Sequence, residues 1–191
     1  MVRFSLFALF LMMKTTLSLL STKTTRFFPS LKSTLITDFQ QSLDSQLILA
    51  PLTRGGNLPF RNLCAEFGAI FTESEMVIAR NLFKGPSQRK ERALTKKGRL
   101  ETYFGVQIAT KCHDEALRAA ELAAEAGASW LDLNSGCPIY EATHRGLGSA
   151  MLKKPAVLEK MVSATKAQLA PYFLSSNAVL KQYLHSVKKV Y

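Results

Sequence analysis

Short apolar runs that alternate with helical patterns are the feature that most restricts the folds open to this chain. Four such runs, at residues 47–50, 69–72, 103–109 and 130–134, have the length and composition of buried strands. Segments long enough to form helices separate them, and strands arranged in this way pair in parallel through right-handed crossovers. The pattern predicts an α/β fold built from four βα units.

Helices are expected at residues 58–67, 114–126 and 155–169, and residues 76–83 are interpreted as helical or irregular. The charged stretch 85–99 is predicted to be an exposed loop. The segment 114–126 gives the strongest helical signal, because acids crowd its first turn and a glycine follows its end. Two architectures fit four βα units: a small open α/β sheet, or the first half of an eight-stranded (β/α)8 barrel of the TIM type.

Composition and charge exclude several other classes. With 191 residues, of which 47% are hydrophobic, the chain can form one domain with a substantial core, and its three cysteines are too few for a disulfide scaffold. The net charge of +11 comes from the ends: residues 1–37 hold five Lys and Arg and no acid, and residues 153–191 hold seven lysines and one glutamate. Residues 38–152 hold thirteen basic and thirteen acidic residues, so the high pI says little about what the central region binds.

The first 45 residues have the composition of a targeting segment. The apolar run at residues 4–13 is too short to span a bilayer, which needs about 20 apolar residues, but it suits the core of a signal peptide. Residues 14–37 are basic, rich in Ser and Thr and free of acids, as organellar transit peptides are. We expect an organelle, plastid or mitochondrion, as the location, and no stable membrane span. A cytoplasmic protein whose N-terminus is disordered or touches a membrane is the alternative.

Polar residues follow the ends of the predicted strands, which is where active sites gather in folds of this class. They are residues 51–53, residues 73–75, Gln107 and residues 134–138. Cys137 lies on a turn formed by Gly136 and Pro138. A free thiol with a pKa of roughly 8.5 is mostly protonated at pH 7 and can donate a proton, whereas a positive neighbour would make it a thiolate nucleophile. A small buried hydrophobe is the third interpretation, and the local spacing does not separate the three.

Five groups of short motifs occur in one order over about residues 47–162. They are Ala50-Pro51-Leu52-Thr53 with Asn57-Leu58-Pro59-Phe60-Arg61, Thr72-Glu73 with Glu75-Met76, Gly105-Val106-Gln107-Ile108, Asp132-Leu133-Asn134-Ser135-Gly136-Cys137-Pro138, and Arg145-Gly146-Leu147-Gly148-Ser149-Ala150-Met151-Leu152. Each is weak alone, but in this order they resemble the tRNA-dihydrouridine synthases, flavoenzymes on a (β/α)8 barrel. The resemblance implies that the chain holds the first half of such a barrel.

The resemblance also implies a reaction. Such enzymes use NADPH to reduce FMN; the flavin hydride then goes to C6 of a uracil in tRNA, and a cysteine protonates C5. Cys137 matches that catalytic cysteine, and Asn134 matches a residue that helps to hold the uracil and the flavin. Arg145 is a candidate contact to tRNA phosphate, with a solvated charge as the alternative. The uracil must leave its stack to reach the flavin.

A flavin-binding role is implied for four residues. Pro51, Leu52 and Thr53 match the backbone after the first strand that lies against the isoalloxazine ring, and Gln107 matches an amide side chain that bonds the polar edge of the ring. Metal binding is not expected, because the Cys and His residues that could join Cys137 lack a regular ligand spacing.

Three segments are therefore predicted: a targeting or disordered segment (1–45), a partial FMN-binding barrel (46–165) and a divergent basic tail (166–191). The later strands of the family barrel, with their phosphate-binding loops, and its tRNA-gripping helical domain have no counterpart in the tail. We expect a truncated synthase-like protein that is weakly active or inactive alone. The alternatives are a non-catalytic fragment or βα binding module, and another flavin-barrel oxidoreductase that acts on a small substrate. The oligomeric state stays open.

Overall fold

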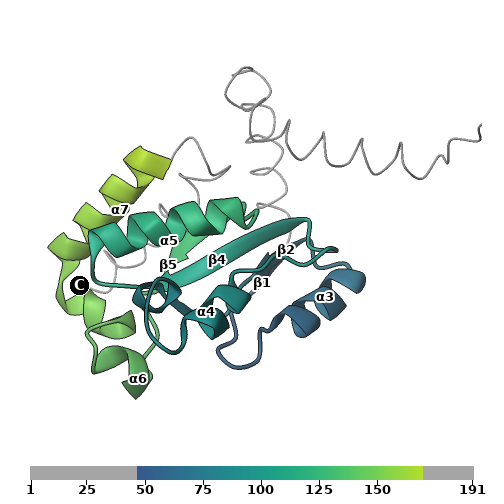
Figure 1. Ribbon diagram of the computed structural model, residues 1–191, viewed down its shortest axis with the longest axis horizontal. Coiled ribbons are helices and arrows are strands. Elements are labelled where there is room, and N and C mark those ends of the chain that lie inside the picture. Colours follow the sequence, from purple (N-terminus) through teal and green to yellow (C-terminus); the bar gives the residue numbers. More distant parts are fainter. Residues whose placement is uncertain (1–46, 170–191) are drawn as a thin grey trace, which may run out of the picture. The chain divides into compact units, whose positions relative to one another are not determined.

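The computed structural model describes residues 47–169 (Figure 1). The predicted targeting segment (1–45) and most of the predicted tail (166–191) lie outside the described residues. The described strands are β1 (Ile48–Leu49), β2 (Phe71–Glu73), β3 (Val77–Ile78), β4 (Tyr103–Ala109) and β5 (Trp130–Leu133). The helices are α3 (Leu58–Glu66), α4 (Gln88–Leu94), α5 (His113–Glu125), α6 (Tyr140–Thr143) and α7 (Pro155–Leu169), with the short 3-10 helices η1 (Ala79–Leu82) and η2 (Gly148–Lys153). No helix within this part of the chain is long and apolar enough to cross a membrane.

All pairs of strands in the sheet are parallel. β1 pairs with β2, β2 and β3 both pair with β4, and β4 pairs with β5. Because Gly105 and Ile108 of β4 also pair with β5, β2 and β3 share the opposite edge of β4. The strands therefore cross the sheet in chain order, without the reversal of a doubly wound sheet. This is the order of a (β/α)8 barrel, and it confirms the predicted α/β fold with the first four βα units.

The second strand of the barrel is interrupted between β2 and β3. Glu73 lies opposite Gly105, and Val77 lies opposite Ile108. The β2–β3 stretch thus holds one residue more than the facing part of β4, as a β-bulge does. Ser74 bridges the interruption: its N–H donates to the Gly105 carbonyl at 2.9 Å, and its hydroxyl oxygen accepts a backbone N–H of β4 at 3.0 Å.

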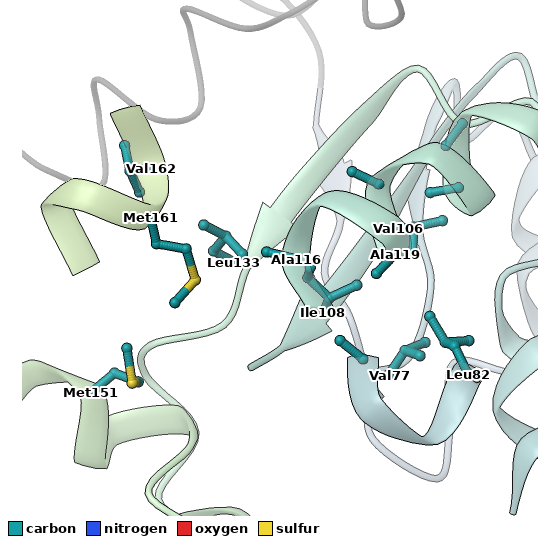
Figure 2. Packing of buried hydrophobic residues seen from close by; sticks show 14 of the residues in the cluster. Val77, Leu82, Val106, Ile108, Ala116, Ala119, Leu133, Met151, Met161 and Val162 are labelled. Atoms are coloured by element: carbon teal, nitrogen blue, oxygen red, sulfur yellow. The ribbon is translucent and has the colours of Figure 1, made fainter. Parts of the chain in front are cut away.

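Residues of β4 alternate between the two faces of the sheet. Phe104, Val106 and Ile108 face the helices and are fully buried in the main core. Opposite them, α5 carries a stripe of alanines, and Figure 2 shows Ala116 and Ala119 beside the labelled side chains of the strand. Small residues let this helix pack closely on the bulkier side chains of β4. The other face of the sheet forms the inside of the barrel.

The structure corrects the interpretation of residues 76–99. The expected exposed loop at 85–99 is wrong, because α4 lies within it, and residues 76–83 contain β3 followed by η1. A helix of seven residues gives little periodic signal in a sequence. Its own side chains fasten it to η1 instead: Nε2 of Gln88 and Nε of Arg92 both donate to the Leu82 carbonyl, at 3.2 and 2.9 Å.

The first strand also differs from its prediction. Residues 47–50 are expected to form a buried strand, but only Ile48–Leu49 pair with β2. Leu47 is 91% exposed and Ile48 is 42% exposed. The reason is that β1 is the edge strand of the described sheet, so that within the described residues a neighbouring strand covers it on one side only. By contrast, α3, α5 and α7 begin and end within one residue of the predicted bounds.

A buried ion pair fastens α3 to the sheet. Arg61 of α3 is fully buried, and its Nε donates to Oε1 of Glu101 at 2.8 Å. Its other nitrogens donate to the carbonyls of Gly56 and Lys96 at 2.9 and 2.8 Å. The hydroxyl of Thr72 on β2 donates to the same Glu101 oxygen at 2.6 Å. Each of the three guanidinium nitrogens thus donates one hydrogen bond, and the carboxylate of Glu101 balances the buried charge.

Candidate active site at the carboxyl ends of the strands

Gln107 of β4 lies at the centre of a side-chain network on the inner face of the sheet. Its Nε2 donates to Oδ2 of Asp132 on β5 at 2.6 Å, and its Oε1 accepts from Nδ2 of Asn134 at 2.8 Å. Gln107 and Asp132 are direct partners in the strand pairing, which places their side chains on one face. A carboxylate only accepts hydrogen bonds, so Asp132 fixes which end of the Gln107 amide faces Asn134.

Asn134 in turn shapes the loop that carries Cys137. Its Oδ1 accepts the backbone N–H of Cys137 at 3.0 Å and that of Gly136 at 3.3 Å, which forms an Asx-type turn. The Cys137 carbonyl accepts the N–H of Ser149 at 2.9 Å. Gly148 beside it has a φ of +59°, and a Cβ there would overlap the Cys137 carbonyl oxygen. Only glycine allows η2 to approach the cysteine loop this closely.

The side chain of Cys137 is half-buried at the edge of a small apolar cluster. The cluster consists of Met76, Ala109, Ala142 and Leu147. Such a position suits a thiol that has to meet a substrate on one side while the protein shields it from water on the other. The structure therefore brings together three of the predicted site residues, Gln107, Asn134 and Cys137, through two side-chain hydrogen bonds.

Glu73 of β2 and Asp132 of β5 form a carboxyl pair on this inner face. Burial raises the pKa of Glu73 to about 9, and the charge of Asp132 adds to the shift. Burial also raises the pKa of Asp132, although the hydrogen bond from Gln107 opposes the change. Because two neighbouring carboxylates resist ionising together, the pair retains one proton near neutral pH, which we assign to Glu73. Asp132 then remains ionised, with its carboxylate facing the amide group of Gln107.

The sequence interpretation missed this pair as part of the site. Both residues belong to the family-like motifs, and Glu73 follows the end of a predicted strand, but neither is predicted to bind or to react. The sequence does contain a signal for Asp132. This residue stands two residues before Asn134 in a predicted strand, so both side chains face the same side of the sheet. A carboxylate on the inner face of a largely apolar strand needs a partner.

The loop after β1 supplies Pro51, Leu52 and Thr53. The Leu52 carbonyl accepts the N–H groups of Gly55 at 2.9 Å and Gly56 at 2.6 Å, which turns the chain back sharply. Pro51 is half-buried, whereas Leu52 and Thr53 are exposed. Leu52 and Thr53 are therefore accessible to a ligand. No hydrogen bond joins these three residues to the Gln107 network within the described part of the chain.

Arg54 ties the loop after β1 to its neighbours. Its backbone N–H donates to the carboxylate of Glu75, in the bulge between β2 and β3, at 2.5 Å. Its guanidinium lies 3.7 Å from the carboxylate of Glu141 on α6, a pair that is mostly exposed and therefore weak. The loops that follow β1, β2 and β5 are connected in this way at one end of the sheet.

Arg145, the candidate contact to RNA, is exposed and lies beyond α6. Its carbonyl accepts from Nζ of Lys111 at 2.9 Å, and its side chain makes no hydrogen bond to any residue in 47–165. The structure thus leaves this side chain in solvent, apart from the network. Among the described residues, no three His, Cys, Asp or Glu side chains gather where they could hold a metal ion.

A parallel barrel sheet with polar side chains and a half-buried cysteine at the carboxyl ends of its strands defines a class, the barrel enzymes. Within that class, residues 48–171 match the family model described as dihydrouridine synthase. The chain belongs to the dihydrouridine synthase family, whose members are oxidoreductases that act on tRNA.

Curated relatives agree with this membership. The chain is 41% identical over 137 residues to a rice protein named tRNA-dihydrouridine(47) synthase [NAD(P)(+)]-like, an alignment that covers 71% of this chain and 19% of the rice protein. It is 41% identical over 123 residues to an Arabidopsis thaliana protein of the same name, covering 64% and 18%. A human protein of that name is 39% identical over 118 residues, covering 61% and 18%. The chain spans about a fifth of the length of these relatives.

Proposed function

We propose that the protein takes part in the reduction of uridine to 5,6-dihydrouridine in tRNA, with FMN as cofactor and NADPH as reductant. The observation that carries this proposal is the hydrogen-bonded chain from Gln107 through Asn134 to the backbone of Cys137. This chain lies inside the segment that matches the family model. It would hold an amide and a thiol in fixed positions at the carboxyl ends of two neighbouring strands.

The residues present fit a flavin. In the network Gln107 uses one of its two amide N–H groups and one lone pair of Oε1, so one donor and one acceptor remain for the polar edge of an isoalloxazine ring. The turn at residues 51–53, where Leu52 and Thr53 are exposed, offers a surface against which the ring can lie. When bound, the flavin would supply hydride chemistry, and the protein would supply orientation.

Cys137 is proposed as the proton donor to C5 of the uracil. Asn134 holds the cysteine N–H and Ser149 holds its carbonyl, so the loop is fixed from both sides. Asn134 is also proposed to help hold the uracil, and the exposed Arg145 to contact a tRNA phosphate. Fixed positions matter because a displacement of about 1 Å can lower such a rate roughly 100-fold.

Purification tests the cofactor assignment. Protein that stays yellow through gel filtration and releases FMN on denaturation supports a flavoenzyme. Replacement of the bound flavin by added riboflavin then tests whether the protein distinguishes FMN from a flavin without phosphate. A colourless protein that takes up no added FMN favours the alternative, a non-catalytic fragment or binding module. Turnover of a small substrate without change in tRNA would instead favour another flavin-barrel oxidoreductase.

A second test concerns the polypeptide itself. We propose that these 191 residues alone reduce uridine weakly or not at all when incubated with FMN, NADPH and unmodified tRNA. Positions 47–165 supply the network and the cysteine, but uridine reduction also requires the cofactor and the tRNA to be held firmly. Dihydrouridine formation that disappears in Cys137→Ala would contradict this expectation.

For the location we propose an organelle, on the composition of residues 1–45. A fusion of these residues to a fluorescent protein is expected to enter plastids or mitochondria, and a diffuse cytoplasmic signal would contradict this.

A further inference from the structure

The basic residues of the central region are concentrated in one short segment. Residues 84–99 contain seven Lys and Arg and one acid, although residues 38–152 as a whole are neutral. The rest of that region therefore carries an acidic excess. A local group of charges of one sign produces a field that the net charge does not reveal.

α4 turns this segment into a defined surface. One face of the helix lines a surface hollow of about 370 Å³. The lining residues are Gln88, Arg89, Arg92 and Ala93, which lie along one side of α4, and Lys96, which follows the end of the helix. The three cations among them are exposed, and Arg92 is anchored through its Nε on the Leu82 carbonyl.

The single acid of the segment does not neutralise this face. Glu91 accepts the N–H of Ile78 at 3.0 Å and the side-chain amide of Asn81 at 3.2 Å, so its carboxylate is engaged with β3 and η1. Within residues 47–165, no carboxylate forms an ion pair with a cation of α4. The positive charge of the hollow is therefore available to a ligand.

We propose that the surface formed by Arg89 and Arg92 of α4, together with Lys96 just beyond its end, binds the phosphodiester backbone of RNA. The inference rests on the proposed tRNA function and adds a binding surface to it. Arginine guanidinium groups bind phosphate oxygens with paired donors, and lysine adds a mobile point charge. A lipid surface fits less well, because a helix that binds membranes combines its cations with large apolar side chains, whereas the apolar residue in this lining is Ala93.

The salt dependence of tRNA binding tests the proposal. The full 191-residue chain is titrated, without flavin or NADPH, into labelled unmodified tRNA and followed by fluorescence anisotropy. For the double variant R89Q/K96Q we expect weaker binding and a slope of log K against log salt that is less steep by about 1.4 to 1.8, at roughly 0.7 to 0.9 for each lost phosphate contact. Arg92 is left in place because its side chain also supports η1.

A charge-matched control separates a local site from general attraction. Lys153 and Lys154 are exposed at the end of η2, and K153Q/K154Q loses the same charge. We expect its slope to equal that of the wild type, and R89K/K96R to bind like the wild type. Circular dichroism and the unfolding temperature of R89Q/K96Q are expected to be unchanged, since neither replaced side chain forms a hydrogen bond within the described residues.

Several results would overturn the proposal. These are an unchanged slope in R89Q/K96Q, an equal loss of slope in K153Q/K154Q, and tighter binding to vesicles of anionic phospholipid or to duplex DNA of similar length than to tRNA. Failure of the proposed function would look different. If the protein takes up no flavin and only R89Q/K96Q makes the salt dependence less steep, the RNA-binding surface is supported and the synthase function is not.

Discussion

Asp132 controls how the two amides of the candidate site are oriented. In Asp132→Leu the Nε2 group of Gln107 loses its acceptor, and an unsatisfied buried donor costs about 1–3 kcal/mol. We expect D132L to lower the free energy of unfolding by this amount. We also expect faster alkylation of Cys137, because Asn134 no longer fixes the cysteine loop. Urea unfolding and mass spectrometry of iodoacetamide-treated protein measure the two effects.

Asp132→Asn is the matched control for this experiment. Its amide oxygen still accepts from Gln107, so both effects are expected to be smaller than in D132L. Equal alkylation of Cys137 in the wild type and D132L would show that the network does not control the loop.

The carboxyl pair predicts how stability depends on pH. Folding raises the pKa of Glu73 from 4.5 to about 9, so between these values the folded state binds more protons than the unfolded state. The free energy of unfolding therefore falls as pH rises through this window, by up to about 1.4 kcal/mol per pH unit. The raised pKa of Asp132 acts in the same direction.

Glu73→Gln cannot ionise and tests this dependence. Its free energy of unfolding is expected to change less between pH 5.5 and pH 8 than that of the wild type, and its stability relative to the wild type is expected to rise with pH. Urea titrations at both pH values measure the difference. Parallel pH profiles would contradict a buried, protonated Glu73.

At the scale of elements, α3 depends on one buried cation. Arg61→Met leaves Glu101 buried without its partner, and breaking such a pair costs about 3–5 kcal/mol. The double variant R61M/E101L removes both charges and is expected to lose less stability than the two single variants together. The exposed Arg99→Ala serves as a control, with a change within about 0.5 kcal/mol. Additive losses in the R61M/E101L cycle would contradict a coupled pair.

Elements with a strong local signal could be predicted from the sequence. α5 has acids in its first turn and Gly127 after its end, and β4 is a run of aromatic and branched residues. α4 and β3 could not be predicted, because both are short and are held by contacts with each other and with η1, such as Glu91 of α4 on the Ile78 N–H of β3. The β-bulge at Ser74 was equally invisible, since it appears only when β2 is paired with β4.

The site residues that lie within one sequence motif could be predicted from the sequence. Asn134 and Cys137 lie three residues apart, and their contact is local. The pairing of Glu73 with Asp132 depends instead on two strands that lie on either side of β4. That pairing requires the register of the whole sheet, which the sequence alone does not give.

At the scale of the whole molecule, the net charge of a region does not describe how its charges are distributed over the surface. Residues 38–152 hold equal numbers of basic and acidic residues, so their net charge is zero. The structure places Arg89, Arg92 and Lys96 around one surface hollow beside α4, while the only acid of residues 84–99, Glu91, is engaged with β3 and η1. The distribution of charge over a folded surface, and not the net charge, determines which ligands the surface attracts.

The dihydrouridine content of tRNA tests the central claim most directly. The measurement is mass spectrometry of tRNA from cells of the source organism that carry Cys137→Ala in this gene, beside cells that carry Cys64→Ala as the matched control. The account predicts that dihydrouridine falls at one or more tRNA positions in the first cells, where other cellular components can support the weak activity expected of the 191 residues alone, and is unchanged in the second. Unchanged dihydrouridine at every position in the Cys137→Ala cells would contradict the account.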